Sequence, residues 1–323
     1  MDADDQAGAG DQAGAGDQAG ADDRVVLLMV SVAMVGTGRM GAAMAARMAA
    51  AGHAVFLYNR TRQRAVEAAV DGGGTVVDTA AAAAAAAEVV LVSLADDAAV
   101  TATYGGPEGL VAGLRPGTVV LEMSTIAPET ARQVGRLVAE RDAVLLDAPV
   151  SGSVPSIRQG QLTVLAGGDA AALDRARPVL DSFAGRVFHL GELGAGATVK
   201  LVVNLVVHAL NHALSEALVI AERAGVDRAA VYEVFANSAM AAPFVQYKKE
   251  AFLHPDQAPV AFALELVAKD LDLIAALARQ VGARADLATT VRDTVGEAVE
   301  AGLGDADMSG LASFLRRPPP AST

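Results

Sequence analysis

Lys200 and Asn204 are four residues apart in a run, 199–210, whose only other polar member is His208. In a helix this spacing places the ammonium and the carboxamide on one face. An ammonium in apolar surroundings is costly to desolvate, so its pKa tends to fall toward neutrality, where the group can donate or accept a proton. Lys200 is therefore a candidate acid or base and Asn204 its neighbour. The alternative is a lysine that extends its head into solvent.

A second pattern with chemical meaning is GxGxxG, which stands between an apolar strand predicted at 32–35 and a helix predicted at 40–50. The first glycine permits a tight turn, the second lets backbone approach a pyrophosphate, and the third lets helix and strand pack closely. The pattern predicts that a dinucleotide binds at Gly36, Thr37, Gly38, Arg39, Met40 and Gly41. A glycine turn without a ligand is the alternative.

The end of the next predicted strand, 54–58, indicates which dinucleotide binds. An enzyme that uses NAD usually places an acid here, to hold the ribose hydroxyls. This chain has Asn59, Arg60 and Thr61 instead. A guanidinium forks onto phosphate oxygens and a threonine hydroxyl can donate as well, so the pattern favours NADP(H). Binding of NAD(H), with Arg60 as a solvated turn residue, remains open.

Strand and helix patterns alternate through the first part of the chain. Further strands are predicted at 89–93, 118–122, 143–147 and 161–166, and a crossover helix capped by Thr79 at 80–87. Such alternation predicts a Rossmann-type, doubly wound parallel sheet with helices on both faces. After about residue 194 only helices are predicted, broken at Gly225, Pro243, Pro255 and Gly282. We expect a disordered acidic Ala/Gly-rich tail at 1–28, a dinucleotide-binding domain at 29–193, an all-helical domain at 194–316 and a flexible tail at 317–323.

Composition excludes several classes of protein. The first 23 residues hold seven aspartates and no base, and removing their charges from the formal −13 leaves −6 for the rest, which disfavours nucleic acid as a partner. There is no cysteine, and the five histidines form no zinc motif, so we expect no metal site. No uninterrupted apolar run is long enough for a membrane span, and a cytoplasmic location is expected. The long apolar helix predicted at 196–224 favours a homodimer or higher oligomer.

Three further segments follow the glycine turn along the chain: Met123 to Ile126, Asp147 to Ser153, and GxGxxxKxxxN from Gly194 to Asn204. Together with the glycine turn they resemble the β-hydroxyacid dehydrogenase family. The stretches YNRT, PVSGS, GQLTVLAGGD and LGDADMS are similar to the glyoxylate and succinic semialdehyde reductases within it. The resemblance extends from Val32 to Leu315.

The resemblance implies a role for each matching residue. Lys200 would be the general acid or base and Asn204 would hold the substrate. Ser151 and Gly152 would bind the substrate carboxylate, and Thr125 would lie where nicotinamide and substrate meet. Leu94, Ala95 and Lys269 would line the cofactor. Independently, a small acid needs donors for its carboxylate, and hydroxyls with loop amides can supply them. The available hydroxyls are those of Ser124, Thr125, Ser151 and Ser153.

At several positions this chain differs from particular members of the family, and these differences narrow the choice of activity. Val203 and the lack of a C-terminal extension argue against a 6-phosphogluconate dehydrogenase, and Lys200 argues against an imine reductase. Asn59 with Arg60 argues against a 3-hydroxyisobutyrate dehydrogenase, and Ser153 replaces a common glycine. We therefore expect an NADP(H)-dependent reductase of a small aldehyde or keto acid. The alternatives are a 3-hydroxy acid dehydrogenase that works in the oxidative direction and a non-catalytic dinucleotide-binding oligomerisation module. Met240, Phe244, Tyr247 and Phe262 are weaker candidates for the helical side of the site.

Overall fold

The computed structural model describes residues 29–255 and 257–317. The predicted tail at 1–28 lies outside the described residues, as do residues 318–323 of the predicted C-terminal tail. In the first domain the chain forms β1 (Ser31–Val35), α1 (Arg39–Ala50), β2 (Ala54–Tyr58), α2 (Arg62–Gly72), β3 (Thr75–Val76), α3 (Ala80–Ala86), β4 (Val89–Val92), α4 (Asp97–Tyr104), α5 (Leu110–Gly113), β5 (Val119–Glu122), α6 (Pro128–Ala139) and β6 (Val144–Asp147).

These strands form one parallel sheet in the order β3-β2-β1-β4-β5-β6. The central strands carry apolar residues at 32–35, 89–92 and 119–121, and helices cover these residues on both faces of the sheet. Thr79 begins α3 as predicted, since its hydroxyl accepts a hydrogen bond from the Ala82 amide at 3.0 Å. The predicted Rossmann-type sheet is thus confirmed. Its order reverses between β1 and β4, which is where such sheets bind ligands.

The strand predicted at 161–166 forms, but it does not join the parallel sheet. It is β8 (Leu162–Ala166), the centre of a separate sheet between β7 (Val150–Ser151) and β9 (Ala184–His189). β8 is antiparallel to β7 and parallel to β9. Helices α7 (Val154–Arg158) and α8 (Ala170–Leu180) connect these strands. The prediction missed β7, which has two residues, and β9, a largely exposed edge strand with little hydrophobic periodicity.

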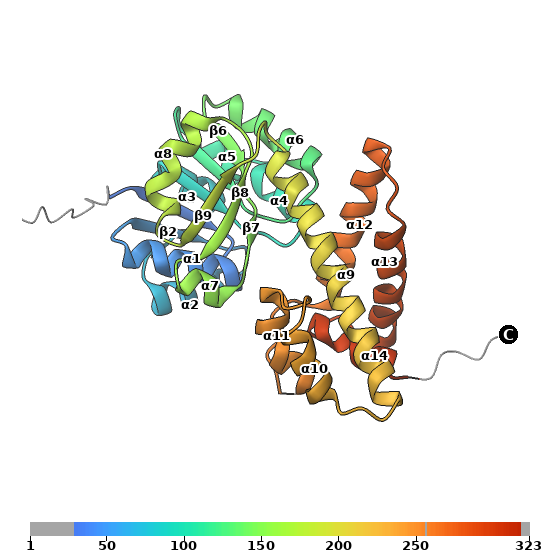
Figure 1. Cartoon of the computed structure of the whole chain (residues 1–323). Helices are drawn as coiled ribbons and strands as arrows, with labels where there is room; N and C mark the ends of the chain where they lie inside the picture. Colours follow the sequence, from blue (N-terminus) through green and yellow to red (C-terminus); the bar gives the residue numbers. More distant parts are fainter. Residues whose placement is uncertain (1–28, 256, 318–323) are drawn as a thin grey trace, which may run out of the picture.

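The second domain is helical, as predicted. It consists of α9 (Ala195–Arg223), α10 (Arg228–Ala236), α11 (Pro243–Leu253), α12 (Leu264–Val281), α13 (Asp286–Ala298), a π-helical turn (Val299–Leu303), a 3-10 turn (Met308–Gly310) and α14 (Leu311–Leu315). Figure 1 shows α9, in yellow, running from the first domain down through the second. Its N-terminal turns contact α6 and β8, and its later turns pack on α12, α13 and α14. This helix therefore carries its residues from one domain to the other.

Helix α9 is long and apolar enough, by length and composition alone, to cross a membrane, with a mean hydropathy of 1.3 over its richest window. It nevertheless carries four buried polar side chains. Asn204 and His208 contact Asp270 of α12, Asn211 donates to the Met308 carbonyl, and Ser215 donates to a carbonyl of α9 itself. Polar groups of this kind are costly in hydrocarbon. We interpret α9 as the central helix of the domain.

Candidate active site

The glycine turn has the backbone geometry that a dinucleotide requires. Gly36 has φ +95°, and a Cβ there would lie 2.2 Å from the Ser93 carbonyl oxygen. At Gly41 a Cβ would lie 2.0 Å from the Gly36 carbonyl, so the third glycine lets α1 approach the turn. A Cβ at Gly38 would meet nothing within 4 Å, which leaves space beside the first turn of α1. These features fit a pyrophosphate at the N-terminus of α1, next to Arg39 and Met40.

Asn59 connects the glycine turn to the end of β2. Its Oδ1 accepts a hydrogen bond from the Thr37 amide at 3.2 Å, and its Nδ2 donates to the Thr61 carbonyl at 3.0 Å. Arg60 and Thr61 are exposed beside this connection. The Asn59 amide is thus used to hold two turns together, while the guanidinium and hydroxyl next to it are accessible to a phosphate.

The loops after β4 and β5 meet through Ser124. Its hydroxyl accepts a hydrogen bond from the Leu94 amide at 2.8 Å and is buried. The Leu94 side chain reaches the glycine turn, where a Cβ on Gly36 would lie 2.9 Å from its Cδ2. Ala95 is exposed next to Leu94. Leu94 therefore lies where the cofactor was expected, but Ser124, predicted as a substrate ligand, is occupied in holding the two loops.

Lys200 lies one turn before Asn204 on α9 and is partly buried. Desolvation by burial lowers the pKa of Lys200 to about 8, the nearby Lys269 lowers it further, and the charge of Asp270 acts in the opposite direction. An amine with such a pKa is present in both protonation states near neutral pH, which suits proton transfer in either direction.

Asp270, on α12, was not predicted as a functional residue, and it joins the predicted ones. Its Oδ2 accepts a hydrogen bond from Asn204 Nδ2 at 2.6 Å, and its Oδ1 lies 2.8 Å from Lys269 Nζ. Lys269 Nζ also donates to the Thr125 carbonyl at 2.8 Å, which ties the helical domain to the loop after β5. Burial acts to raise the pKa of Asp270, but the His208 hydrogen bond and the Lys269 charge outweigh it and hold this pKa below its usual value. The sequence signal for Asp270 was an acid on the apolar face of an amphipathic helix.

Asp147, at the end of β6, fixes the start of α9. Its carboxylate oxygens accept hydrogen bonds from the amides of Gly194 at 2.7 Å and Ala197 at 2.6 Å. These amides have no partner within the helix, and an anion at a helix N-terminus is also favoured by the helix dipole. A Cβ at Gly196 would lie 2.2 Å from the Leu165 carbonyl, so this glycine permits close contact with β8. Asp147 thereby determines where Lys200 lies relative to the sheet.

The predicted carboxylate loop follows Asp147 directly. Ser151 is the second residue of β7 and Gly152 is exposed with φ +135°. Ser153 begins α7, where its amide and hydroxyl lie 3.4 Å and 3.3 Å from Ser156 Oγ. Ser153 therefore has the local capping role that serine often has in loops. We retain Ser151, Gly152 and Thr125 as proposed substrate contacts and assign structural roles to Ser124 and Ser153.

Four residues were weaker candidates for the helical side of the site. Of these, Phe262 lies beside His208 and Asp270. Its ring centroid is 5.9 Å from that of His208, which contacts Asp270. Phe244 is buried and packs on Tyr247, while Tyr247 and Met240 are largely exposed. Phe262 is therefore the best placed of the four to face a substrate.

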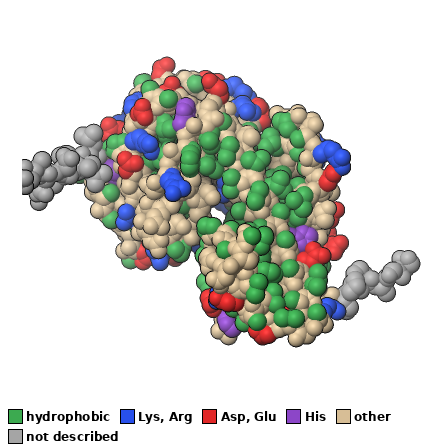
Figure 2. Space-filling model, in the orientation of Figure 1, with side chains coloured by type: hydrophobic (Ala, Val, Ile, Leu, Met, Phe, Trp, Pro, Cys, Tyr) green, Lys and Arg blue, Asp and Glu red, His purple; other side chains and the backbone are tan. Residues whose placement is uncertain are grey.

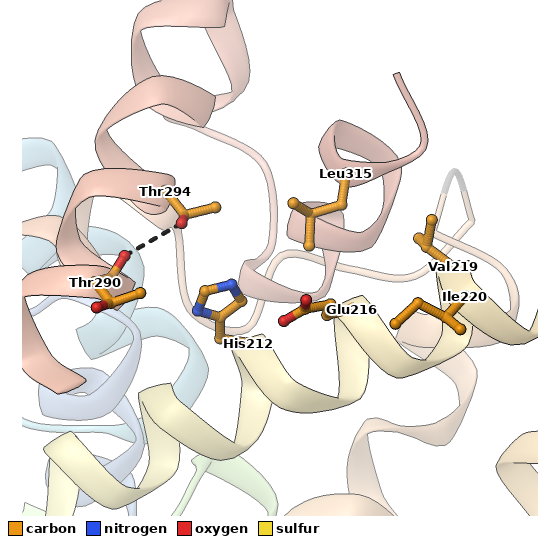
Figure 3. A pocket seen from close by; sticks show the side chains of 7 residues that line it. All are labelled: His212, Glu216, Val219, Ile220, Thr290, Thr294 and Leu315. Atoms are coloured by element: carbon orange, nitrogen blue, oxygen red, sulfur yellow. Dashed lines mark hydrogen bonds between the residues drawn. The ribbon is translucent and has the colours of Figure 1, made fainter. Parts of the chain in front are cut away.

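A cavity of about 410 Å³ lies elsewhere on α9 and contains none of the predicted residues. Figure 3 shows His212, Glu216, Val219 and Ile220 projecting into it from α9, opposite Thr290 and Thr294 of α13 and Leu315 of α14. Because His212 is 12 residues beyond Lys200 on a straight helix, the cavity is about 18 Å along the axis from the lysine. It belongs to the helical domain alone.

Comparison with known proteins identifies both domains. Residues 31–191 match the family model described as the NAD binding domain of 6-phosphogluconate dehydrogenase. Residues 194–315 match the model described as the NAD-binding domain of NADP-dependent 3-hydroxyisobutyrate dehydrogenase. The two matches follow one another along the chain and together span the described domains.

Among individual proteins, a 3-hydroxyisobutyrate dehydrogenase of Pseudomonas aeruginosa is 35% identical over 88% of this chain and 96% of its own length. The glyoxylate/succinic semialdehyde reductase 2 of Arabidopsis thaliana is 29% identical over 89% of this chain and 80% of its own. The structure of Mycobacterium tuberculosis 3-hydroxyisobutyrate dehydrogenase with L-serine superimposes with a TM-score of 0.79 at 32% identity, and covers 90% of this chain and 100% of that one. The chain therefore belongs to the β-hydroxyacid dehydrogenase family of NAD(P)-dependent oxidoreductases.

Proposed function

We propose that this enzyme reduces a small aldehyde or keto acid to the hydroxy acid with NADPH, and that Lys200 is the proton donor. The observation that carries this proposal is the position of Lys200 one turn from Asn204 on α9, where buried Asp270 accepts the hydrogen bond of the Asn204 amide. Burial also lowers the pKa of Lys200 to about 8. A nicotinamide held in this site would supply the hydride. The carbonyl oxygen then gains negative charge, which the Lys200 ammonium stabilises and neutralises by giving up its proton.

Substrate orientation comes from the residues around Lys200. We assign the substrate carboxylate to the Ser151–Gly152 loop and the carbonyl oxygen to Lys200, with Asn204 beside it. Asp270 prevents Asn204 from rotating, because it accepts the hydrogen bond from its Nδ2. Lys269 and Thr125 close the cofactor side of the site through their hydrogen bond. In the oxidative direction the neutral amine of Lys200 accepts the proton of the hydroxyl.

NADP(H) is the proposed cofactor because the end of β2 offers a guanidinium and a hydroxyl to the 2′-phosphate and no acid to the ribose. The same feature was our argument against a 3-hydroxyisobutyrate dehydrogenase. That argument is weakened, because the family model matched by residues 194–315 is described as NADP-dependent 3-hydroxyisobutyrate dehydrogenase. The 35% identity to a 3-hydroxyisobutyrate dehydrogenase makes oxidation of a 3-hydroxy acid the second candidate function.

We also propose that a second copy of the chain covers α9. Three apolar side chains on one stripe of this helix are exposed by 47% (Val202), 66% (Val206) and 61% (Ile220). Figure 2 shows hydrophobic side chains gathered over the helical domain. A straight apolar stripe is suited to packing on its own copy across a two-fold axis. Light scattering should give the mass of a dimer or larger assembly, and the mass of a monomer would exclude this packing.

The function is tested by following NADPH consumption with glyoxylate, succinic semialdehyde and longer aldehyde acids, and NADP⁺ reduction with 3-hydroxyisobutyrate and L-serine. The proposal expects that one of the aldehyde acids has a higher kcat/KM than either 3-hydroxyisobutyrate or L-serine. Higher kcat/KM in the second set would establish the second candidate function. If NADPH binds and no compound in either set reacts, the reductase proposal fails for these substrates and the non-catalytic alternative gains support.

A further inference from the structure

Glu122, the last residue of β5, is a buried acid that the reaction does not use directly. Its side chain is 0% exposed. One carboxylate oxygen, Oε1, accepts a hydrogen bond from the Ser124 amide at 2.9 Å. The other, Oε2, accepts one from the Tyr104 hydroxyl at 2.9 Å. A charged group in the interior is costly unless it is hydrogen-bonded, and the bonds from Ser124 and Tyr104 offset part of that cost.

Ser124 connects Glu122 to the loop beside the predicted cofactor site. Its hydroxyl holds the Leu94 amide at 2.8 Å, and Leu94 in turn packs beside Gly36 of the glycine turn. The next residue, Thr125, accepts the hydrogen bond from Lys269 of the helical domain. Glu122 therefore lies beneath the point where the glycine turn, the loop after β4 and the loop after β5 come together.

The surroundings of Glu122 oppose its charge. Burial raises the pKa of Glu122 to about 7, Asp97 adds to the increase, and the hydrogen bonds from Ser124 and Tyr104 reduce it. Its register neighbours are apolar Val92 on β4 and acidic Asp147 on β6, whose own charge is offset by the amides of α9 and by Arg132 of α6. The titratable side chains that act on its charge are thus Tyr104 and Asp97 from α4. Asp147 of β6 is its register neighbour and is bonded to the amides of α9.

We propose that Glu122 is a positioning residue for the dinucleotide, which acts through Ser124 to hold the loops that carry Leu94 and Thr125 in their binding conformation. The ionised carboxylate can accept from both the Ser124 amide and the Tyr104 hydroxyl. Protonation removes the negative charge, and a neutral carboxyl group is a weaker acceptor than a carboxylate for the Ser124 amide. Protonation therefore loosens the connection from Ser124 to Leu94. Dinucleotide affinity should fall as pH decreases through neutrality.

The test is the Kd of NADPH, measured by its fluorescence at pH 6 and pH 8 without substrate, for the wild type and Glu122→Gln. The amide is neutral at both pH values, so the variant should lack this part of the pH dependence. The wild type should lose about two- to tenfold more affinity than the variant between pH 8 and pH 6, the equivalent of one hydrogen bond. Titration of the 2′-phosphate of NADPH occurs with both proteins and cancels in this comparison. The matched control is Glu140→Gln, an exposed acid at the end of α6, which should behave as the wild type.

Tyr104→Phe provides a second, independent arm. It removes a hydrogen bond that lowers the pKa of Glu122, so the midpoint of the pH dependence should move to higher pH. If Glu122→Gln does not fold, this variant decides the question. Equal pH dependence of Kd in the wild type and Glu122→Gln, or an unmoved midpoint in Tyr104→Phe, would overturn the proposal.

This inference rests on the proposed function only in taking NADPH as the ligand. Because the measurement is binding without substrate, failure of every aldehyde acid to react would disprove the proposed reaction and leave this result intact. Conversely, the ratio of the NADPH Kd of Glu122→Gln to that of the wild type could be the same at pH 6 and pH 8 while turnover is normal. That result would disprove the role of Glu122 and leave the reaction intact. Thermal unfolding of the same proteins separates loss of folding from loss of positioning.

Discussion

The glycine turn and the group formed by Lys200, Asn204 and Asp270, called here the Lys200 group, are built in opposite ways. The turn is local: six consecutive residues, Gly36 to Gly41, supply the backbone, and the strand before it and the helix after it fix its shape. The Lys200 group is assembled from distant parts of the chain, since Asn204 is held by Asp270, 66 residues later, and the start of α9 by Asp147, about 50 residues earlier. Local sites can be read from a motif, whereas assembled sites depend on packing.

The two regions also use charge differently. At the turn the proposed ligand carries the charge, and the protein offers backbone and an exposed guanidinium. Around Lys200 the protein buries its own charges, and each must be compensated by another. Changes at the assembled site should therefore affect catalysis and stability together, while a change at the exposed Arg60 beside the turn should affect cofactor choice alone.

The largest effect should follow from removing the amine itself. Lys200→Ala should lower kcat by about 10²- to 10⁴-fold, the usual contribution of general acid catalysis, because the nearby Lys269 ammonium is already bound to the Thr125 carbonyl and to Asp270. The Kd of NADPH should change little, since the glycine turn is unaffected. Lys249→Ala, which removes an exposed lysine paired with Glu233, is the matched control. Full activity in Lys200→Ala would remove the lysine from the mechanism.

A smaller effect, on two properties at once, is expected from Asp270→Asn. The variant leaves Lys269 without its buried partner and should lose about 3 kcal/mol of unfolding free energy at neutral pH. Because the pKa of Asp270 is lowered in the folded protein, this deficit should shrink as pH falls into the usual carboxyl range. Loss of the negative charge should also lower the pKa of Lys200 below about 8.

Urea unfolding and pH-rate profiles measure the two effects of Asp270→Asn. Asp272→Asn, two residues along the same helix, removes an exposed acid paired with Arg292 and should cost about 1 kcal/mol or less. If both variants lose the same free energy and keep the same pH profile, the Asp270 carboxylate does not organise the site.

The smallest effect should occur at Arg60, after β2 and beside the turn. Arg60→Asp should lower the preference for NADPH over NADH by about tenfold, because it replaces a charged donor with a charge that repels the 2′-phosphate. The kcat with saturating cofactor and the unfolding free energy should remain near the wild-type values. Ratios of kcat/KM for the two cofactors measure the change, and Arg136→Asp on α6 is the control for net charge. An unchanged ratio would show that Arg60 does not recognise the phosphate.

The sequence was sufficient for features that depend on neighbouring residues. The strand at 54–58, the capped helix after Thr79 and the turn at Gly36 to Gly41 all form as their patterns predict. It was insufficient where a side chain finds a distant partner. The Ser124 hydroxyl, predicted to face the substrate, accepts a hydrogen bond from the Leu94 amide on another loop. Ser153, predicted in the same way, instead makes a local capping contact with Ser156.

The roles of Asp147 and Asp270 were missed for the same reason. Each is a single acid within an apolar strand end or helix face, and only the fold brings Gly194 to one and Asn204 to the other. The separate sheet around β8 was likewise missed, because the two-residue strand β7 and the exposed strand β9 have almost no hydrophobic periodicity. Buried acids on otherwise apolar faces are the signal to look for in such sequences.

The most direct test of the account is the pH dependence of kcat/KM in both reaction directions, with the preferred aldehyde acid and its hydroxy acid product. If Lys200 carries the proton, reduction needs the ammonium and oxidation the free amine. Reduction should therefore slow as pH rises through about 8, and oxidation should accelerate through the same pKa. Profiles that are flat across this range, or limbs that persist unchanged in Lys200→Ala, would contradict the assignment of Lys200 as the proton carrier.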